Sequence, residues 1–458
     1  MPKIIARLAA TAAVVSLASF VSVGSAAFAV DDAVISTPPA ITAVSDSVRP
    51  YPAGPFKPCS AAKTVQQPAL GKFYAYAMDA VTGRVLVNLR GTESTPSASV
   101  LKVLTAAAAM RNLPSTYRAE TKIFTDPAEP GTIYVRGGGD HTLSRMTGES
   151  FTTYWRPARL ETLAKKFFKI YPVDAQITKI VLDSSFFEGD TYNRFWKASD
   201  RTNGYISHIT ALQIDGDRAN PDLTSKKYNG YRSTDPVLAA GRAIRAALGD
   251  RASSATLTKG LLPPTAIEIT KVSSQTINTW LIHALGLSDN TETEFIARHA
   301  ALAASYPASF DSIQPMVKQV LAELKISSAG LVMKDGSGLS QLNRVTPKLV
   351  AQLMAKVANS EEYLGNMEGM LPVAGRTGTL AGRFTGYNAV ARGFVKAKSG
   401  YIPGLYSLAG IIDSKDGGRI AFAIFARSGD GKTVSYLARP ALDSVAAKFY
   451  RCGLGLTL

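Results

Sequence analysis

Residues 96–112 read Pro-Ser-Ala-Ser-Val-Leu-Lys-Val-Leu-Thr-Ala-Ala-Ala-Ala-Met-Arg-Asn, and this stretch decides the fold. Past Ser99 its residues leave almost no polar face, and a helix that is apolar all round is usually buried. Its first turn nevertheless carries Ser99 and Lys102, which at this spacing lie on one face of the helix. The stretch therefore predicts a buried helix that presents a hydroxyl and an amine together at its N-terminal end.

The start of such a helix suits nucleophilic chemistry, because it offers free backbone N–H groups and a partial positive charge. A neighbouring amine can deprotonate a serine there, and amides already in position can stabilise an oxyanion. Ser99 and Lys102 thus have the layout of a serine acyltransferase that uses lysine instead of histidine. The structural alternative is an N-capping serine beside a lysine that reaches solvent. The isolated pattern is weak, since residues 60–63, Ser-Ala-Ala-Lys, match it too and receive no role.

The length and the N-terminal residues indicate an exported, multidomain protein. A chain of 458 residues, 46% of them hydrophobic, predicts two or three globular domains. Residues 1–29 read as a secretory signal, with Lys3 and Arg7, an apolar run and a small-x-small cleavage site at 27–29. An uncleaved membrane anchor is the alternative. Residues 30–58 contain six prolines and predict a disordered or extended tether.

The net charge and the cysteines indicate which partners and which redox compartment to expect. Removal of the signal lowers the formal net charge only from +16 to +14, because the signal carries two basic residues and no acidic one. For an exported protein this favours anionic partners such as cell-wall polymers or lipid headgroups. The basic residues are scattered without interleaved aromatics, so nucleic acid is not an expected partner. Cys59 and Cys452 are the two cysteines; we predict that they form a disulfide, with two free thiols as the alternative.

The hydrophobic pattern predicts an α+β fold in which one region is inserted into another. Both ends of the chain supply strands, so 59–116 and 276–458 are expected to form one domain around a five-stranded, antiparallel sheet flanked by helices. Residues 117–275 mix strand and helix patterns and are expected to be a large inserted α/β region. The strands of the sheet are predicted at 73–79, 84–89, 394–398, 406–413 and 419–426, and helices at 160–170, 236–248, 277–286, 292–305, 313–324, 347–359 and 434–450.

Three other sequence patterns receive no catalytic role. Residues 136–140, Arg-Gly-Gly-Gly-Asp, lack the Gly-Lys-Ser/Thr ending of a phosphate loop and predict a tight turn. Residues 200–222 lack the ligand spacing of a calcium loop and predict a polar surface loop. The four histidines have no partner at metal-ligand spacing, so neither a metal nor a cofactor is expected.

Two motifs downstream complete the pattern that Ser99 and Lys102 begin. Ser288-Asp289-Asn290 lies between two predicted helices, and Lys398-Ser399-Gly400 lies in a predicted strand. This triple, with Lys-Thr-Gly as its third part, is typical of penicillin-binding proteins and class A β-lactamases.

Each motif residue has an expected role. We expect Ser99 to be the nucleophile and Lys102 its base, Ser288 a proton relay, and Asn290 the residue that holds Lys102 and the substrate amide. Lys398 and Ser399 would bind a terminal carboxylate, and Gly400 would let the substrate pair along the strand. The backbone N–H groups of Ser99 and Tyr401 would form the oxyanion hole.

At this point the chain resembles the D-Ala-D-Ala carboxypeptidase/endopeptidase family of peptidoglycan enzymes, peptidase family S13, of the penicillin-binding protein 4 type. The similarity covers most of 60–450 and includes Gly137-Gly138-Gly139-Asp140, 182–187, 335–340 and 371–375. It implies a penicillin-binding-protein/serine β-lactamase-like transpeptidase domain with an insertion between the first two motifs. It also implies hydrolysis of the terminal D-Ala-D-Ala bond, cleavage of cross-links in peptidoglycan stem peptides, and covalent inhibition by β-lactams.

The chain departs from the family pattern at three positions. Ser399 and Tyr401 stand where Lys-Thr-Gly-Thr has threonines; serine keeps the hydroxyl, whereas tyrosine adds a bulky ring beside the site. Thr377 stands where Gly-Arg-Asp-Gly-Thr-Leu has aspartate, so that 376–379 imitates the third motif. We reject this second copy because no strand pattern follows it.

The sequence thus predicts a serine D-Ala-D-Ala carboxypeptidase of the cell envelope, periplasm or extracellular space, with endopeptidase activity as well. One alternative is a β-lactamase-like hydrolase, which would need a second base that no residue here supplies. The other is a catalytically decayed wall-binding protein, which Tyr401 favours and the intact motifs oppose.

Overall fold

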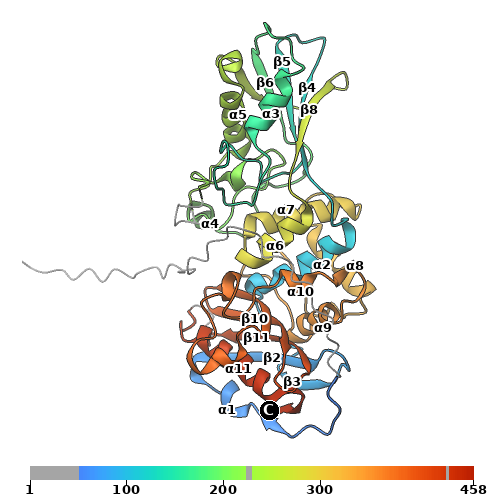
Figure 1. Cartoon of the computed structure of the whole chain (residues 1–458), viewed down its shortest axis with the longest axis vertical. Helices are drawn as coiled ribbons and strands as arrows, with labels where there is room; N and C mark the ends of the chain where they lie inside the picture. Colours follow the sequence, from blue (N-terminus) through green and yellow to red (C-terminus); the bar gives the residue numbers. More distant parts are fainter. Residues whose placement is uncertain (1–50, 223–229, 430–432) are drawn as a thin grey trace, which may run out of the picture.

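The computed structural model describes residues 51–222, 230–429 and 433–458, and these form an elongated molecule with two lobes (Figure 1). The terminal lobe, at the bottom of Figure 1, contains the segments 59–116 and 276–458. The inserted lobe, at the top, contains 117–275. Helices α6 (Ile277–Leu287) and α7 (Asn290–Ala303) lie where the two lobes meet. The predicted signal and residues 30–50 of the predicted tether lie outside the described residues.

One sheet organises the terminal lobe and takes strands from both ends of the chain. Strands β9 (Val395–Ile402), β10 (Leu405–Asp413) and β11 (Arg419–Arg427) form an antiparallel ladder. The hairpin of β2 (Lys72–Asp79) and β3 (Val85–Leu89) lies beside β11. The β2–β11 contact is looser than the ladder: Ala80 N–H donates to the Arg419 carbonyl at 2.8 Å, and Gly71 bridges Arg427 at the other end. The five predicted strands therefore lie side by side, with three paired ladders and one looser contact between β2 and β11.

Each face of this sheet buries its own apolar core, because successive strand residues point to opposite sides. On β11, Ala421, Ala423 and Phe425 join the core that includes α2 (Lys102–Asn112) and α9 (Pro347–Ala358). The intervening Ile420, Phe422 and Ile424 join the core of α11 (Ala438–Cys452). A single strand thus packs against helices on both sides, which is why it reads as a continuous apolar run.

The chain ends of the terminal lobe meet beside α11. β1 (Cys59–Ser60) pairs in parallel with β12 (Leu456–Thr457), and a disulfide joins Cys59 to Cys452, whose Cα atoms are 5.2 Å apart. Residues 51–58 lie against this lobe: Phe56 packs on the α11 core, and the Tyr51 hydroxyl donates to Asp79. The last part of the predicted tether is therefore packed rather than free.

The inserted lobe has a separate five-stranded sheet of mixed direction, in the order β7-β6-β5-β4-β8. Helices α3 (Leu160–Phe168) and α5 (Pro236–Ala247) share an apolar core with it. The sequence did not indicate β7 or β8, since both are largely exposed and alternate with Thr, Lys and Glu. The strands are β4 (Glu120–Thr125), β5 (Thr132–Gly137), β6 (Lys179–Asp183), β7 (Thr256–Lys259) and β8 (Ile267–Ser273).

The prediction of a polar surface loop at 200–222 is wrong for most of that stretch. Asp215, Asp217 and Arg218 are buried, as are the apolar residues just before them. The segment lies between the inserted sheet and α7, and its charged groups have partners inside: Arg218 pairs with Asp289, and Asp217 accepts hydrogen bonds from Ser233. Buried charges normally have such partners, and these partners lie far away in sequence.

The other α-helices of the described residues are α1 (Ala62–Val65), α4 (Ala198–Thr202), α8 (Ile313–Glu323) and α10 (Met367–Met370). A search of the described residues for helices long and apolar enough to cross a membrane finds none.

Candidate active site

Ser99 lies in a 3₁₀ turn, Ala98–Leu101, that leads directly into α2. Two glycines press against this turn. A Cβ on Gly338 would stand 2.0 Å from the Ala98 carbonyl oxygen, and a Cβ on Gly400 would stand 2.9 Å from the Ser99 nitrogen. Ala98 itself has a φ of +47°, a left-handed conformation that is uncommon for a residue with a side chain. The backbone around Ser99 is therefore held by close approach of two other segments, and larger residues would displace it.

Lys102 connects all the groups around Ser99. Its Nζ donates to Ser99 Oγ at 3.1 Å, to Asn290 Oδ1 at 2.6 Å and to the Ser337 carbonyl at 2.7 Å. These three acceptors use all three donors of an ammonium group. Burial lowers the pKa of Lys102 to about 8, although the negative charges of Glu294 and Asp335 oppose the shift. A substantial neutral fraction is thus available near pH 8, and a neutral amine can accept a proton from Ser99.

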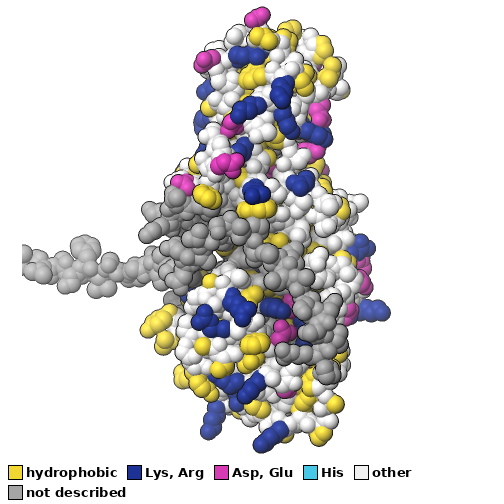
Figure 2. Space-filling model, viewed as in Figure 1, with side chains coloured by type: hydrophobic (Ala, Val, Ile, Leu, Met, Phe, Trp, Pro, Cys, Tyr) yellow, Lys and Arg dark blue, Asp and Glu magenta, His cyan; other side chains and the backbone are white. Residues whose placement is uncertain are grey.

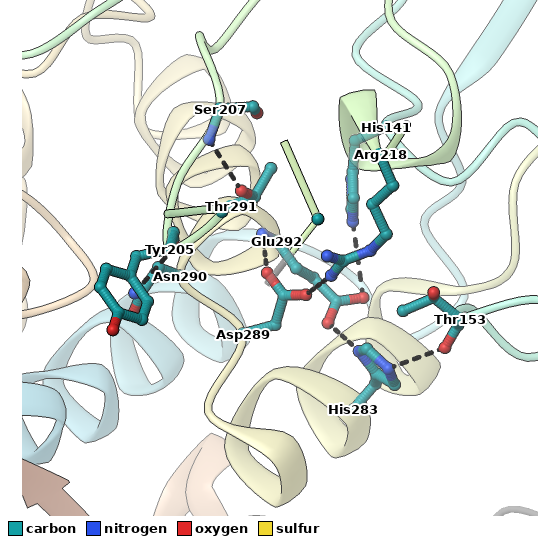
Figure 3. A network of polar contacts seen from close by, with 12 residues as sticks. His141, Thr153, Tyr205, Ser207, Arg218, His283, Asp289, Asn290, Thr291 and Glu292 are labelled. Atoms are coloured by element: carbon teal, nitrogen blue, oxygen red, sulfur yellow. Dashed lines mark hydrogen bonds and ion pairs between the residues drawn. The ribbon is translucent and has the colours of Figure 1, made fainter. Parts of the chain in front are cut away.

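The turn between α6 and α7 brings the second motif to the same place. Ser288 adopts a left-handed conformation, φ +63°, which ends α6. Asp289 then caps α7 by accepting a hydrogen bond from Glu292 N–H at 3.0 Å. As a result Ser288 and Asn290 face the lysines, whereas the Asp289 carboxylate points to Arg218 of the inserted lobe (Figure 3).

Lys398 approaches from β9, on the sheet side. Its Nζ donates to Ser288 Oγ at 2.8 Å and to the Ser399 carbonyl at 2.9 Å. Burial, together with the positive charges of Lys102 and Arg383, holds the pKa of Lys398 well below its usual range. Among the described residues no carboxylate lies within ion-pair distance of either lysine. Neither lysine is thus held in an ion pair, which suits the binding of an anionic substrate group.

The remaining residues of the third motif line the edge of the site. Ser399 Oγ hydrogen-bonds with Thr379 Oγ1 at 2.8 Å, so two hydroxyls stand side by side. Thr379 belongs to the rejected second copy, 376–379; that stretch is a loop with a short 3₁₀ turn, Gly378–Leu380, and not a strand. Tyr401 lies opposite Tyr406 with ring centroids 4.6 Å apart, and it remains 39% exposed. The bulky ring thus leans along the sheet instead of filling the space over Ser99.

Two buried carboxylates support the site and were not predicted from the sequence. The Glu294 carboxylate accepts from Gly336 N–H at 3.0 Å and from Ser337 N–H at 2.8 Å. Asp335 accepts from Gly338 N–H at 2.8 Å and from Trp196 Nε1–H at 2.8 Å. Together they hold the loop whose carbonyl receives Lys102. Burial first, and then the charge of Asp335, raises the pKa of Glu294 to about 7.

Signals for both carboxylates are present in the sequence. Residues 335–340 belong to the stretches that carry the family resemblance, although no role was assigned to them. Glu294 lies four residues after Asn290 on the same helix, which places it on the same face.

A polar network joins the second motif to the inserted lobe (Figure 3). Asn290 Nδ2 donates to the Tyr205 carbonyl at 3.0 Å, and Ser207 N–H donates to Thr291 Oγ1 at 3.2 Å. Arg218 Nη2 lies 2.6 Å from Asp289 Oδ2, and both side chains are more than nine-tenths buried. This charge and that of His283 lower the pKa of Asp289 to about 2, against the effect of burial.

The same network continues through a buried glutamate that lies between two histidines. His283 bonds Glu292 through Nδ1 and the Thr153 carbonyl through Nε2, and His141 Nε2 is 3.6 Å from Glu292. Each ring nitrogen of His283 thus faces an oxygen atom, one on the Glu292 side chain and one on the Thr153 backbone. Burial lowers the pKa of His283, but the charge and hydrogen bond of Glu292 outweigh it and raise the pKa overall. In the described part of the chain no group of three His, Cys, Asp or Glu residues could hold a metal ion.

Comparisons with known proteins show the family to which the chain belongs. A model of the D-Ala-D-Ala carboxypeptidase 3 (S13) family matches residues 59–234 and 224–449. The chain is 32% identical over 398 residues to Carboxypeptidase DacB of Mycolicibacterium smegmatis, which covers 86% of this chain and 84% of that protein. It is 24% identical over 425 residues to a D-alanyl-D-alanine carboxypeptidase of Actinomadura, with 76% of each chain covered.

The fold gives the same result. The crystal structure of penicillin-binding protein 4 from Haemophilus influenzae superposes with a TM-score of 0.69 at 21% identity, covering 85% of this chain and 97% of that one. The predicted α+β, penicillin-binding-protein-like fold is therefore confirmed. The matched length and the identity to the mycobacterial relative lead to one conclusion: the chain is a serine peptidase and belongs to the D-Ala-D-Ala carboxypeptidase 3 (S13) family.

Proposed function

We propose that the protein is an exported D-Ala-D-Ala carboxypeptidase that works through an acyl-enzyme on Ser99. The single observation that supports this most strongly is the 3.1 Å hydrogen bond between Lys102 Nζ and Ser99 Oγ, made by an amine whose pKa is about 8. A base within hydrogen-bond reach and with a pKa near ambient pH meets both requirements of general base catalysis.

Acylation and deacylation follow from these contacts. Neutral Lys102 takes the Ser99 proton while Oγ attacks the carbonyl carbon of the penultimate D-Ala. The N–H groups of Ser99 and Tyr401 stabilise the oxyanion. As the C–N bond breaks, the proton passes to the leaving amine through Ser288 Oγ, which lies 2.8 Å from Lys398 Nζ, and D-Ala departs. Water, deprotonated by the same base, then attacks the ester and regenerates Ser99.

Substrate recognition is assigned to the β9 side of the site. The Ser399 and Thr379 hydroxyls, 2.8 Å apart, are placed to donate to the terminal carboxylate, and Lys398 supplies positive potential behind them. Gly400 leaves the strand edge open for the substrate backbone. The substrates are peptidoglycan stem peptides, so the enzyme acts in the cell envelope, and cross-linked stems would make it an endopeptidase as well. Anionic wall polymers are proposed as further partners because of the net charge.

The test is intact mass after incubation with benzylpenicillin, for the native protein and for Ser99→Ala, with D-Ala release from a D-Ala-D-Ala tripeptide measured in parallel. We expect one stable adduct and D-Ala release for the native protein only. The solved penicillin-binding protein 4 with a bound β-lactam makes this probe appropriate. An intact drug with no adduct and no D-Ala would indicate a decayed site. A consumed drug with no adduct would indicate a β-lactamase.

A further inference from the structure

A cavity lies in the terminal lobe, on the side of the sheet away from Ser99. It has a volume of about 550 Å³ and is formed by α1, the C-terminal half of α11, and the 3₁₀ stretch Gly386–Ala391. A volume of this size lies in the range of small-ligand sites. α11 packs against the sheet face that carries Ile420, Phe422 and Ile424, whereas α2 and Ser99 belong to the opposite core. A ligand in this cavity would therefore not compete with the peptide substrate.

The lining of this cavity is unusual because every residue has a polar side-chain group, and none is acidic. Three are cationic: Lys63, Lys448 and Arg451. Among the described residues none of the three is within ion-pair distance of a carboxylate. Lys448 Nζ has only a disulfide sulfur, Cys59 Sγ, at 3.6 Å as a side-chain partner. Like charges gathered without a counterion repel one another, so an anion would be favoured there.

The neutral lining residues add hydrogen-bonding groups around the same cavity. Asn388 Nδ2 donates to Ser444 Oγ at 3.0 Å, Ser444 Oγ donates to the Pro440 carbonyl at 3.1 Å, and Asn388 retains one amide N–H for a ligand. Tyr387 stands at the rim, 81% exposed, with the Arg451 guanidinium 3.8 Å from its ring centroid. Arg451 also donates to the Tyr387 carbonyl, which fixes the guanidinium at the rim. The cavity thus combines preplaced cations with neutral donors.

The surroundings extend the same charge. In the space-filling view, Lys and Arg side chains recur over the part of the terminal lobe where α1 and α11 lie, with few acidic side chains among them (Figure 2). A long polyanion that lies across this surface would therefore meet attraction on both sides of the cavity.

We propose that this cavity is a binding site for the phosphate groups of an anionic polymer, which holds the enzyme on the cell wall while Ser99 acts elsewhere. Phosphate suits it better than carboxylate, since its oxygens point in several directions and can meet three cations together with the amide and hydroxyl donors. The polymer as physiological source rests on the proposed envelope location; the anion site itself does not.

The test is calorimetric titration of the full chain with inorganic tripolyphosphate at low salt, with tripeptide hydrolysis measured on the same samples. The site variant is Lys63→Gln/Lys448→Gln/Arg451→Gln. The control, Lys169→Gln/Lys318→Gln/Lys325→Gln, removes the same charge from exposed positions outside the cavity. We expect the site variant to bind roughly tenfold more weakly or worse, and the control to stay within about twofold. Both variants should hydrolyse the tripeptide like the native protein, whatever the outcome of the titration.

Four results would overturn the proposal. Absence of tripolyphosphate binding to the native protein, or equal weakening in both triple variants, would leave only diffuse net charge. Tighter binding of oligogalacturonate than of tripolyphosphate would overturn the preference for phosphate. Orthophosphate that binds as tightly as tripolyphosphate would identify a site for the free ion instead of a polymer. Absence of tripeptide hydrolysis by the native protein would contradict the proposed peptidase activity but not the anion site.

Discussion

The two sides of the active site are held in different ways. Ser99 stands on the 3₁₀ turn before α2, Lys102 on α2 and Lys398 on β9. These segments are fixed by apolar packing and by the close approach of Gly338 and Gly400. Ser288 and Asn290 stand on a turn that depends on polar contacts with the inserted lobe (Figure 3). The inserted lobe is therefore part of the support of the catalytic site. Substitutions on the first side should remove the reacting groups, whereas substitutions on the second side should misalign Ser288 and Asn290.

The largest effect is expected from the first side, with Lys102→Ala. Loss of the base should slow acylation by penicillin about 10²- to 10⁴-fold, because no other described group donates to or accepts from Ser99 Oγ. Stopped-flow acylation with a fluorescent penicillin would measure it. Lys63→Ala is the matched control, since Lys63 has the same sequence spacing from Ser60 but stands on the other side of the sheet. Unchanged acylation in Lys102→Ala would refute the base assignment.

A smaller effect is expected from the second side, with Arg218→Ala. The Asp289 carboxylate would remain buried without its closest cation, which costs about 3–5 kcal/mol of stability when a buried pair is broken. Acylation should slow roughly 10- to 100-fold while the base still titrates as before, because Arg218 acts as a positioning residue.

Removing both charges distinguishes positioning from simple destabilisation. Arg218→Leu/Asp289→Asn should recover stability in a denaturant titration, since no unpaired charge is left inside. If acylation recovers fully as well, the ion pair matters only for stability. If acylation stays slow, the inserted lobe aligns Asn290 through this pair.

A shift in pH dependence, with little loss of rate at the optimum, is expected from Glu294→Gln. Glu294 raises the pKa of Lys102, and its own pKa is about 7, so it is largely charged at the pH where Lys102 titrates. Removing that charge should lower the pKa of Lys102 and move the acid limb of acylation to lower pH. The control is Glu323→Gln, which changes a surface pair with Arg111. A shift to higher pH, or the same shift in the control, would contradict this role.

The smallest effect on acylation is expected from Cys59→Ser/Cys452→Ser, which touches neither side of the site. Loss of the disulfide should lower the free energy of unfolding by about 2–5 kcal/mol, because the bond restricts the conformational freedom of the unfolded chain. Acylation at 25 °C should remain as in the native protein. Slow acylation by a folded variant would show that the disulfide also affects the geometry of the active site.

The local sequence was sufficient to predict the features that short motifs and apolar periodicity determine. The Ser99 helix, the Lys398 strand and the turn at Ser288 each carry a short motif, and the alternating apolar cores follow from strand periodicity. Glu294 and Asp335 were missed because their function depends on a contact between α7 and a distant loop.

The buried stretch before Arg218 was read as a surface loop for a related reason. Arg218 pairs with Asp289, which lies far along the chain, and no local pattern records that pairing. Polar residues in a structure-supporting role therefore look like solvated ones until the fold is known.

The meeting of the chain ends has a consequence for the order of folding. The cysteines that join are separated by 393 residues, and β2 must wait for β11 before it has a neighbour on that side. Such distant pairing makes folding slow, because the chain loses the entropy of loop closure before the non-local contacts can stabilise it. A chain that emerges from its N-terminus therefore cannot complete the main sheet, or the site between α2 and β9, until nearly all of it has appeared.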